Sequence, residues 1–405
     1  MIKPSPSDLI KSSVRSIAKN KGRTLLTSLG IIIGVTSVIL LTSIGNGLKK
    51  YVSDQFESLG SNVVYIVPGK VFNDEGGFSN TESFVTLTFD DKDISKISRQ
   101  FKNDLVIPST QLAVDVKAGD KIKKGRSLIG TTPEYGPANN SVPKETNGRW
   151  FTQEETDKNS KVAVLGNKIA QDLFGSVNPL GKKIIVKGKN LKVIGVVDKK
   201  GSTFGGPSLD DHIYTTIGTV QNITGNSDIN TIQVKIKDKS LINKTKTDLE
   251  KLLLDRYEKD TFSVFDSSQL LSSINSIIGT LTIALTGIAA ISLVVGGIGI
   301  MNIMLVTVSE RTKEIGLRKA IGAYPRAILV QFLIEAIILS ALGGFIGVVL
   351  GALGTLAINQ FFPAQITPGS IILAFGVSSL VGVIFGVAPA RKASKLSPIE
   401  ALRYE

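Results

Sequence analysis

The sequence contains no cysteine and a single histidine, His212. Without cysteine the chain can form no disulfide, no thiol nucleophile and no thiolate metal site. One imidazole cannot build a histidine metal cluster. Because His212 lies in a polar stretch, we expect an exposed histidine without a special role.

Nucleotide-binding and catalytic motifs are also lacking. No G-x-x-x-x-G-K-[S/T] sequence occurs in the 405 residues. The segment GSVNPLGKK at 175–183 has one residue too many between its glycines, and a lysine stands where Ser or Thr belongs. No nucleophile, base and orienting group can be assembled, so we expect a non-catalytic chain that itself binds no cofactor and no metal.

Basic residues outnumber acidic ones, with 47 Lys and Arg against 34 Asp and Glu and a formal net charge of +13. Nucleic-acid binding would call for aromatic residues interleaved with the basic ones, or for zinc-ligand spacing, and neither is visible. Much of the excess lies in short segments beside long apolar runs. We therefore interpret it as a membrane-topology signal and expect no nucleic-acid partner.

Four apolar runs are long enough to cross a membrane, which takes about 20 residues. Residues 25–48 carry no charge and exceed the about 7–15 apolar residues of a signal peptide, so they predict an uncleaved anchor. Residues 274–308 are also uncharged and predict a polar stalk from 272 that continues into a second helix. The third run is 327–358. The fourth is 370–388, where Pro389 predicts the helix end.

Lysine and arginine in the flanking segments predict the orientation. Six precede residue 25, five lie in 309–326, four lie in 389–405, and none lies in 359–369. We therefore expect a multi-pass protein of the bacterial plasma membrane with both termini cytosolic. The cytosolic parts are then 1–24, with an amphipathic surface helix at 5–19, the segment 309–326 and the tail 389–405. The region 49–271 and the loop 359–369 lie outside.

The large outer region mixes short β-branched runs with helical ones. The predicted strands are 63–67, 162–165, 183–186, 191–197 and 231–236, and the predicted helices are 94–101, 167–174 and 241–257. Asp90, Asp91 and Asp93 are interpreted as N-terminal capping residues of the first of these helices. The expected fold is a membrane α-helical protein with four transmembrane helices and a large α+β extracytoplasmic domain inserted between helices 1 and 2.

Several residues inside the apolar runs are candidates for helix contacts. Glycines spaced four apart favour close helix packing or dimerisation, and they are Gly30, Gly34, Gly343, Gly347, Gly351, Gly382 and Gly386. Glu335 is an ionisable residue near the expected cytosolic end of its helix, where we expect it to snorkel or to pair with a basic neighbour. Asn302 is expected to form an interhelical hydrogen bond.

The segment SERTKEIGLRKAIGAYPRAILVQFLIEAIILSALGG at 309–344 resembles the cytosolic coupling segment and following helix of the MacB/FtsX-like ABC transporter permease family. The pattern GRWF…VAVLG…LFG…NPLGKKI…VIGVV within 148–197 is similar to the extracytoplasmic core domain of that family, as are residues 46–69. Residues 388–405 resemble its C-terminal ending. The resemblance covers nearly the whole chain, and without a Walker A motif the chain reads as a stand-alone permease subunit.

The resemblance implies ATP-driven efflux by mechanotransmission. A separate ABC ATPase subunit would hold ATP and Mg²⁺, and its motion would reach the outer domain through this chain. The implied ATPase-coupling residues are Glu310, Arg311, Glu314, Ile315, Gly316, Arg318 and Lys319. Independently, Glu310, Glu314 and Arg318 share one helical face at i, i+4 and i+8.

The family also implies a homodimer in membrane lipid, an adaptor of the membrane-fusion type, and export of peptides, toxins or macrolide-like compounds. Two alternatives within the superfamily are a lipoprotein-releasing permease and an FtsX-like regulator of a cell-wall hydrolase. A membrane receptor is a third alternative, although no cytosolic output domain is visible.

Overall fold

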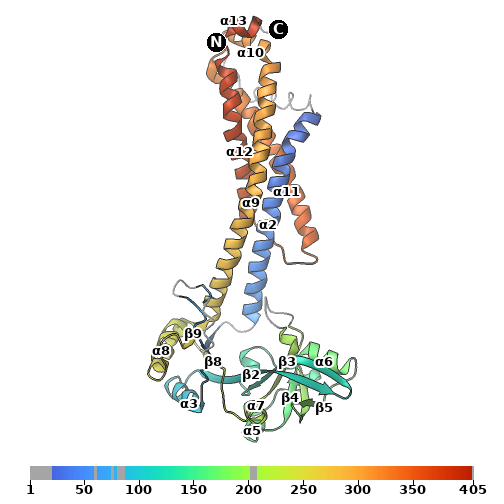
Figure 1. Cartoon of the computed structure of the whole chain (residues 1–405), viewed down its shortest axis with the longest axis vertical. Helices are drawn as coiled ribbons and strands as arrows, with labels where there is room; N and C mark the ends of the chain where they lie inside the picture. The colour runs from blue at the N-terminus through green and yellow to red at the C-terminus, as the bar shows by residue number, and fades with distance from the viewer. Residues whose placement is uncertain (1–20, 59–61, 74–76, 80–86, 201–207, 404–405) are drawn as a thin grey trace. The chain divides into compact units, whose positions relative to one another are not determined.

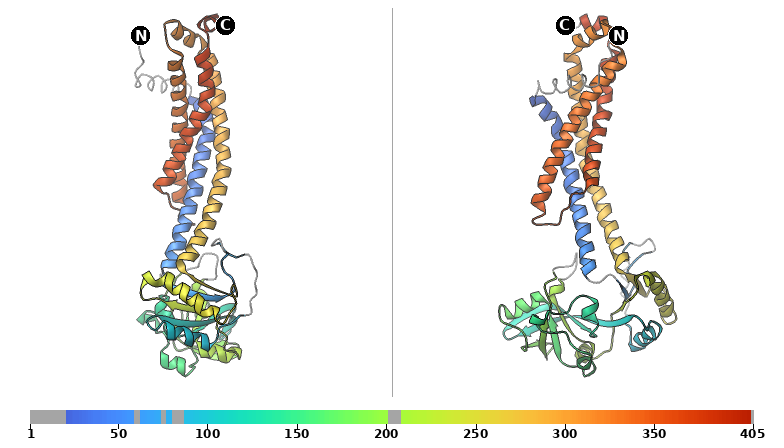
Figure 2. Two further views of the ribbon diagram at one scale, coloured as in Figure 1. Left: turned by 90° about the vertical axis from the view of Figure 1, so that its left-hand side faces the viewer. Right: turned by 180° about the vertical axis from the view of Figure 1, so that it is seen from behind.

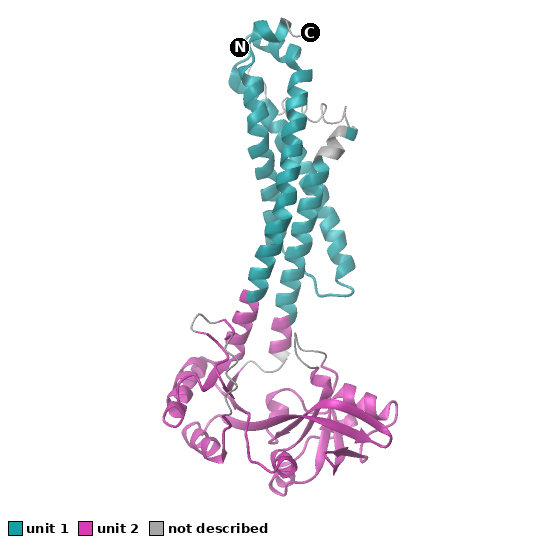
Figure 3. Cartoon of the chain, in the orientation of Figure 1, with its two compact units in different colours: residues 1–51, 277–405 teal, residues 52–276 magenta. Residues whose placement is uncertain are grey.

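The computed structural model describes residues 21–58, 62–73, 77–79, 87–200 and 208–403. The chain divides into two compact units, one made of residues 1–51 and 277–405 and the other of residues 52–276 (Figure 3). The amphipathic helix predicted at 5–19 lies outside the described residues.

The first unit is helical (Figure 1). Its long helices are α2 (Lys21–Ser58), α9 (Ser267–Glu310), α11 (Pro325–Ile358) and α12 (Pro368–Lys395), and its short ones are α10 (Thr312–Ala320) and α13 (Pro398–Arg403). Each of the four long helices contains a stretch long and apolar enough to cross a membrane. The second unit supplies an α+β region between the first and second of them, so the predicted fold class is confirmed.

The prediction that Pro389 ends the fourth helix is wrong. Helix α12 continues through Pro389 to Lys395, and α13 follows after a short turn. Proline removes one backbone hydrogen bond and leaves a carbonyl without its partner, but neighbouring helices can stabilise the distorted turn. Here Pro389 and Ala390 are both buried against the bundle, which holds the helix across the missing bond.

Glycines bring the long helices into close contact. A methyl group added at Gly30 of α2 would lie 2.6 Å from the Cα of Gly296 in α9. The other close approaches are Gly34 to Leu293 (α2–α9), Gly343 to Ser28 and Ile31, Gly347 to Val35 and Gly351 to Ile39 (α11–α2), Gly382 to Ser340 and Gly386 to Ala336 (α12–α11), and Gly297 to Phe385 (α9–α12). The four helices therefore contact one another in a closed cycle, and Figure 2 shows α11 and α12 side by side.

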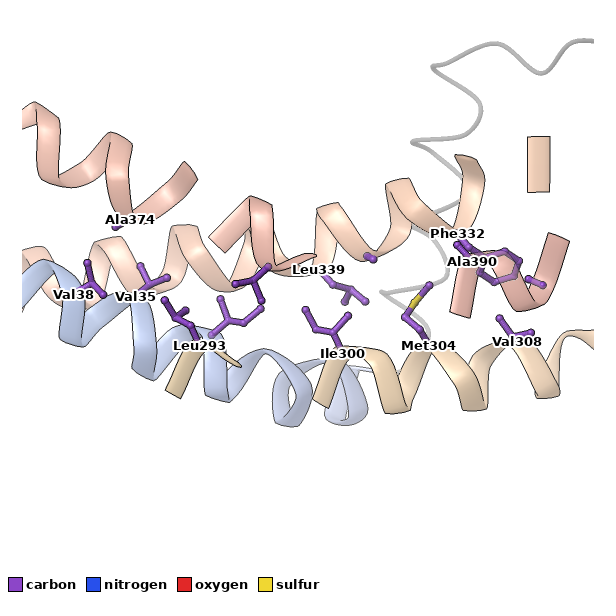
Figure 4. Packing of buried hydrophobic residues seen from close by; sticks show 14 of the residues in the cluster. Val35, Val38, Leu293, Ile300, Met304, Val308, Phe332, Leu339, Ala374 and Ala390 are labelled. Carbon is purple, nitrogen blue, oxygen red and sulfur yellow. The ribbon is translucent and has the colours of Figure 1, made fainter. Parts of the chain in front are cut away.

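Apolar side chains fill the centre of this bundle, as Figure 4 shows. Val35 of α2 lies beside Leu293 of α9, and farther along the bundle Leu339 of α11 lies beside Ile300 of α9. On the outside of α9, Ile283 is 75 % exposed and Ile288 is 65 % exposed. An apolar surface of this kind is typical of helices that face lipid or another helix.

The second unit is built on a nine-stranded sheet in the order β3-β7-β4-β6-β5-β2-β8-β1-β9. The strands are β1 (Val63–Pro68), β2 (Leu105–Ala118), β3 (Lys121–Thr131), β4 (Val162–Leu165), β5 (Lys183–Val186), β6 (Lys189–Val196), β7 (His212–Thr216), β8 (Thr231–Lys235) and β9 (Phe262–Asp266). The helices are α3 (Asp91–Gln100), α4 (Tyr135–Ala138), α5 (Gln153–Asp157), α6 (Asn167–Phe174), α7 (Ile217–Thr224) and α8 (Ile242–Leu254), with 3₁₀ turns at Glu145–Asn147, Leu209–Asp211 and Lys239–Leu241.

The long strand β2 joins two halves of this unit. Its partner β3 also pairs with β7, so β2, β3, β7, β4, β6 and β5 close into a ring around one apolar core. The first residues of β2 pair instead with β8, which leads to β1 and the edge strand β9. This second half has its own core, to which α3 and α8 contribute.

The capping role predicted for the aspartates of α3 is confirmed. Asp90 is the N-cap residue, and its side chain accepts hydrogen bonds from the backbone of Lys92 and Asp93. The Asp93 carboxylate accepts a hydrogen bond from the backbone N–H of Asp90 and completes a capping box. Arg256 then binds both carboxylates, at 2.7 Å and 2.9 Å, and fixes α3 to the end of α8.

Candidate functional site: the α9–α10–α11 junction

Helix α10 is a short element between two long ones. Helix α9 ends at Glu310, and Arg311 leaves helical geometry before α10 begins at Thr312. Gly322 ends the segment in a left-handed conformation with φ of 100°, which favours glycine at a helix end. Pro325 then occupies the first turn of α11, where its missing N–H costs no hydrogen bond.

A connected set of charged and polar side chains holds α10 to α11. Arg311 donates to both carboxylate oxygens of Glu314, at 2.8 Å and 3.1 Å, and it also reaches the Glu335 carboxylate at 3.3 Å. Arg318 lies 2.5 Å from Glu314 and donates to the amide oxygen of Gln331 at 2.7 Å. We call these five residues the junction network.

The junction network provides a partner for the buried carboxylate of Glu335. Glu335 is only 4 % exposed, and an unpaired carboxylate in that position would be strongly unfavourable. Arg311 pairs with it and also lies over the ring of Phe332, 5.5 Å from the centroid. Glu314 lies in α10, outside the four long apolar helices. Hydrogen bonding from Arg311 holds the pKa of its carboxyl below the usual value, so Glu314 stays ionised.

The opposite side of α10 contacts the C-terminal part of the chain. A methyl group at Gly316 would lie 2.7 Å from the Cβ of Ala401, so α13 packs directly on the α10 backbone. Lys319 donates to the carbonyl oxygens of Ser394 and Leu396, both at 2.6 Å, at the end of α12. Helix α10 is therefore fixed on two sides.

The structure places the predicted coupling residues in different environments. Glu314 and Arg318 belong to the junction network, and Ile315 is 2 % exposed in the core of the helical unit. Glu310 is the last residue of α9 rather than part of α10, so the predicted face of Glu310, Glu314 and Arg318 is not one continuous helical surface.

The exposed face of α10 was not identified from the sequence. Within α10, Lys313 is exposed and Leu317 is 55 % exposed, and in the segment between α10 and α11 Ile321 is 79 % exposed and Tyr324 is 60 % exposed. We call these four residues the α10 stripe. The spacing 313, 317, 321 was visible in the sequence, but only the structure shows that this side is uncovered.

The two polar residues predicted inside the helices also differ. Glu335 pairs with a basic neighbour, Arg311. Asn302 is exposed on α9, and within the described part of the chain its predicted hydrogen bond to another helix is not formed.

The second unit contains His212, the single histidine of the sequence. His212, predicted to be exposed, is 7 % exposed because it begins strand β7 in the middle of the sheet. Its ring lines a cavity of about 220 Å³ beside Gln111 and Ser127. Among the described residues no group of three or more His, Cys, Asp or Glu could hold a metal ion.

Two family models match the chain. Residues 24–252 match the MacB-like periplasmic core domain, and residues 286–398 match the FtsX-like permease C-terminal domain. The first match covers most of the second unit and most of α2. The second covers most of α9, the junction network, and helices α10, α11 and α12.

Individual relatives agree with these models. The macrolide export ATP-binding/permease protein MacB of Bdellovibrio bacteriovorus is 40 % identical over 401 residues, which are 96 % of this chain and 61 % of that protein. The chain thus spans about three fifths of that relative. Solved structures with similarity include the periplasmic region of MacB from Actinobacillus actinomycetemcomitans (26 % identity, 55 % of this chain, 97 % of that one, TM-score 0.46) and the extracellular domain of YknZ from Gram-positive bacteria (20 %, 51 %, 100 %, 0.40).

Proposed function

This chain belongs to the family of MacB-like permeases with an FtsX-like C-terminal region, and from that premise we propose that it is the permease subunit of an ABC-type exporter in the bacterial plasma membrane. A separate ATPase subunit binds ATP with Mg²⁺ and hydrolyses it. The present chain relays the resulting motion from α10 to its outer domain. Its cargo is a peptide, a toxin or a macrolide-like compound.

The observation that carries the proposal is that α10 is held firmly yet exposes an apolar stripe. The junction network and the contacts of Gly316 and Lys319 fix α10 to α11, α12 and α13. Leu317, Ile321 and Tyr324 remain uncovered outside the four long apolar helices. Exposed apolar residues of this kind mark protein contacts. A partner bound there would move the long helices with it.

Charge supports the orientation that this role needs. The basic residues around α10 and α13 favour the cytosolic side, where an ATPase meets its nucleotide. The second unit then lies outside the cytoplasm, where an adaptor of the membrane-fusion type can meet it. Two copies of the chain would provide two α10 stripes for the two ATPase subunits of an ABC assembly. The match of residues 24–252 to a MacB-like core domain favours export over the regulatory alternative.

The experiment is co-purification from native membranes in mild detergent after cross-linking, with bound proteins identified by mass spectrometry. The parent chain is compared with Ile321→Asp in the α10 stripe and with Ile122→Asp, a matched control on an outer-unit residue that is 55 % exposed. We expect an ATPase with a Walker A motif to co-purify with the parent and with Ile122→Asp. Ile321→Asp should recover at least about tenfold less, which corresponds to about 1.4 kcal/mol.

Two outcomes would contradict the proposal. One is the absence of any ATPase from the cross-linked parent preparation. The other is an undiminished ATPase yield with Ile321→Asp, which would remove the α10 stripe from the interface. Recovery of a cell-wall hydrolase instead of an ATPase and cargo would favour the alternative of an FtsX-like regulator.

A further inference from the structure

Strand β9 continues into helix α9 without a connecting loop. The strand ends at Asp266, and the helix begins at Ser267. Connections between such elements usually contain several residues. Asp266 is 6 % exposed, and its carboxylate accepts a hydrogen bond from the backbone N–H of Ser268 at 3.0 Å. This carboxylate therefore caps the first turn of a 44-residue helix, where a negative charge is favourable.

Lys246 of α8 connects that turn to the body of the second unit. Its ammonium group lies 2.6 Å from Oδ1 of Asp266 and 2.8 Å from Oε1 of Gln269. Burial raises the pKa of Asp266, but the hydrogen bonds from Lys246 and Ser268 outweigh it and hold that pKa below its usual value. The contact is therefore between partly buried charged groups, and it joins α8 to the end of β9 and the start of α9.

Helix α8 is itself well anchored. Thr245, Leu249 and Leu253 are buried on its inner face, and the two leucines belong to the core shared with β1, β8 and β9. A force that reaches Lys246 is thus transferred to a packed helix rather than to a loop. The first turns of α9 have the colour of the second unit in Figure 3, consistent with their packing there.

The other long helix that enters this unit has a different connection. Helix α2 ends at Ser58 and strand β1 begins at Val63, so residues 59–62 separate them. Of these two long helices, α9 is the one that follows its strand without an intervening residue.

We propose that Lys246 is a positioning residue that locks the first turn of α9 to α8, so that the two helices move as one rigid body. A rotation or shift of α9 is then delivered undiminished to the half of the outer unit that contains α8. The use of this joint in export rests on the proposed function, but the joint itself does not.

The test measures the distance between α8 and α9 in the full chain in lipid nanodiscs. Because the chain contains no cysteine, Glu250→Cys and Ser272→Cys, both exposed, can be spin-labelled specifically. Pulsed electron paramagnetic resonance then gives the distribution of the label distance. We compare the parent with Lys246→Met, which keeps the apolar stem, and with Gln269→Met, which removes only the contact on α9. The matched control is Lys96→Met, whose exposed lysine bonds to Asp255 and the carbonyl of Leu252.

A narrow distribution in the parent and in Lys96→Met, broadened in Lys246→Met and in Gln269→Met, is the expected result. Gln269→Met leaves the pair of Lys246 and Asp266 intact, so its broadening cannot be ascribed to unfolding of the outer unit. Unchanged widths in both variants would overturn the lock. This readout is independent of any ATPase, so failure of the joint and failure of the proposed function are distinguished by the co-purification described above.

Discussion

Single side chains show how burial and partners decide what a residue can do. Glu335 and His212 are both buried polar residues, but Glu335 lies 3.3 Å from Arg311, whereas both ring nitrogens of His212 lack a hydrogen-bond partner among the described residues. Burial lowers the pKa of His212, and the neighbouring Asp211 and Asp210 oppose this only in part. The imidazole is therefore kept neutral by its position in the sheet.

The lowered pKa of His212 predicts that the stability of the protein depends on pH. Below an ordinary pKa of about 6.5 the unfolded chain binds a proton at His212 that the folded chain does not bind, so acidification lowers the free energy of unfolding. His212→Phe removes that contribution, and its stability should fall less than that of the parent between about pH 7.5 and about pH 5.5. Urea unfolding is followed by the fluorescence of Trp150, the single tryptophan, which lies in the second unit and therefore reports on that unit selectively.

No other imidazole complicates the comparison, because His212 is the only histidine. The carboxylates of Asp210 and Asp211 are present in both proteins. An equal loss of stability in the parent and in His212→Phe would show that the folded imidazole is freely protonated.

At the scale of elements, helix contacts depend on where a glycine meets another backbone. Gly296 of α9 lies against α2, and a methyl group there would come within 2.7 Å of the backbone nitrogen of Ile31. Gly287 of the same helix has no heavy atom within 4 Å of the corresponding position. Both glycines lie in the same uncharged run, so the sequence does not distinguish them, but the structure does.

We expect Gly296→Ala to destabilise the bundle by about 2 kcal/mol because the two helices must separate. Gly287→Ala should be neutral or stabilising by up to about 1 kcal/mol, since alanine is the better helix former. Thermal unfolding of both variants in the same detergent measures the difference. Equal midpoints would indicate that α2 and α9 do not pack closely at Gly296.

At the scale of the whole molecule, the order of elements along the chain fixes its topology. The described part of the chain has four helices long and apolar enough to cross a membrane, and the α+β unit is inserted between the first and the second. Under the proposed orientation, α10 and the outer unit lie on opposite sides of the membrane. The same orientation places residues 359–367, between α11 and α12, on the side of the second unit.

Cysteine labelling tests this arrangement in a chain that has no native cysteine. A membrane-impermeant maleimide should label Glu250→Cys and Gln360→Cys in intact cells or protoplasts. It should label Lys313→Cys only after the membrane is permeabilised. Labelling of Lys313→Cys in intact cells would invert the proposed topology and remove α10 from the reach of a cytosolic ATPase.

The sequence was informative where a local pattern is sufficient. Long uncharged runs identified the four helices, β-branched runs identified β1, β4, β5, β6 and β8, and Asp90 with Asp93 identified a helix start. Strands β2, β3, β7 and β9 were not identified. Pro108 and the lysines of 121–124 hide the apolar alternation of β2 and β3. These two strands pair with each other, but their other partners, β8 and β7, come from distant parts of the chain.

The sequence by itself determined the membrane class, the order of units and the family, because charge-free length and contiguous motifs are properties of the chain in one dimension. Only the tertiary structure decided that α12 continues past Pro389, that Arg318 reaches Gln331 of α11, and that Leu317 and Ile321 face outward. Only the fold also brings Lys246 to Asp266 and Gln269. These features depend on which surfaces are covered, and residues distant in the sequence supply the cover.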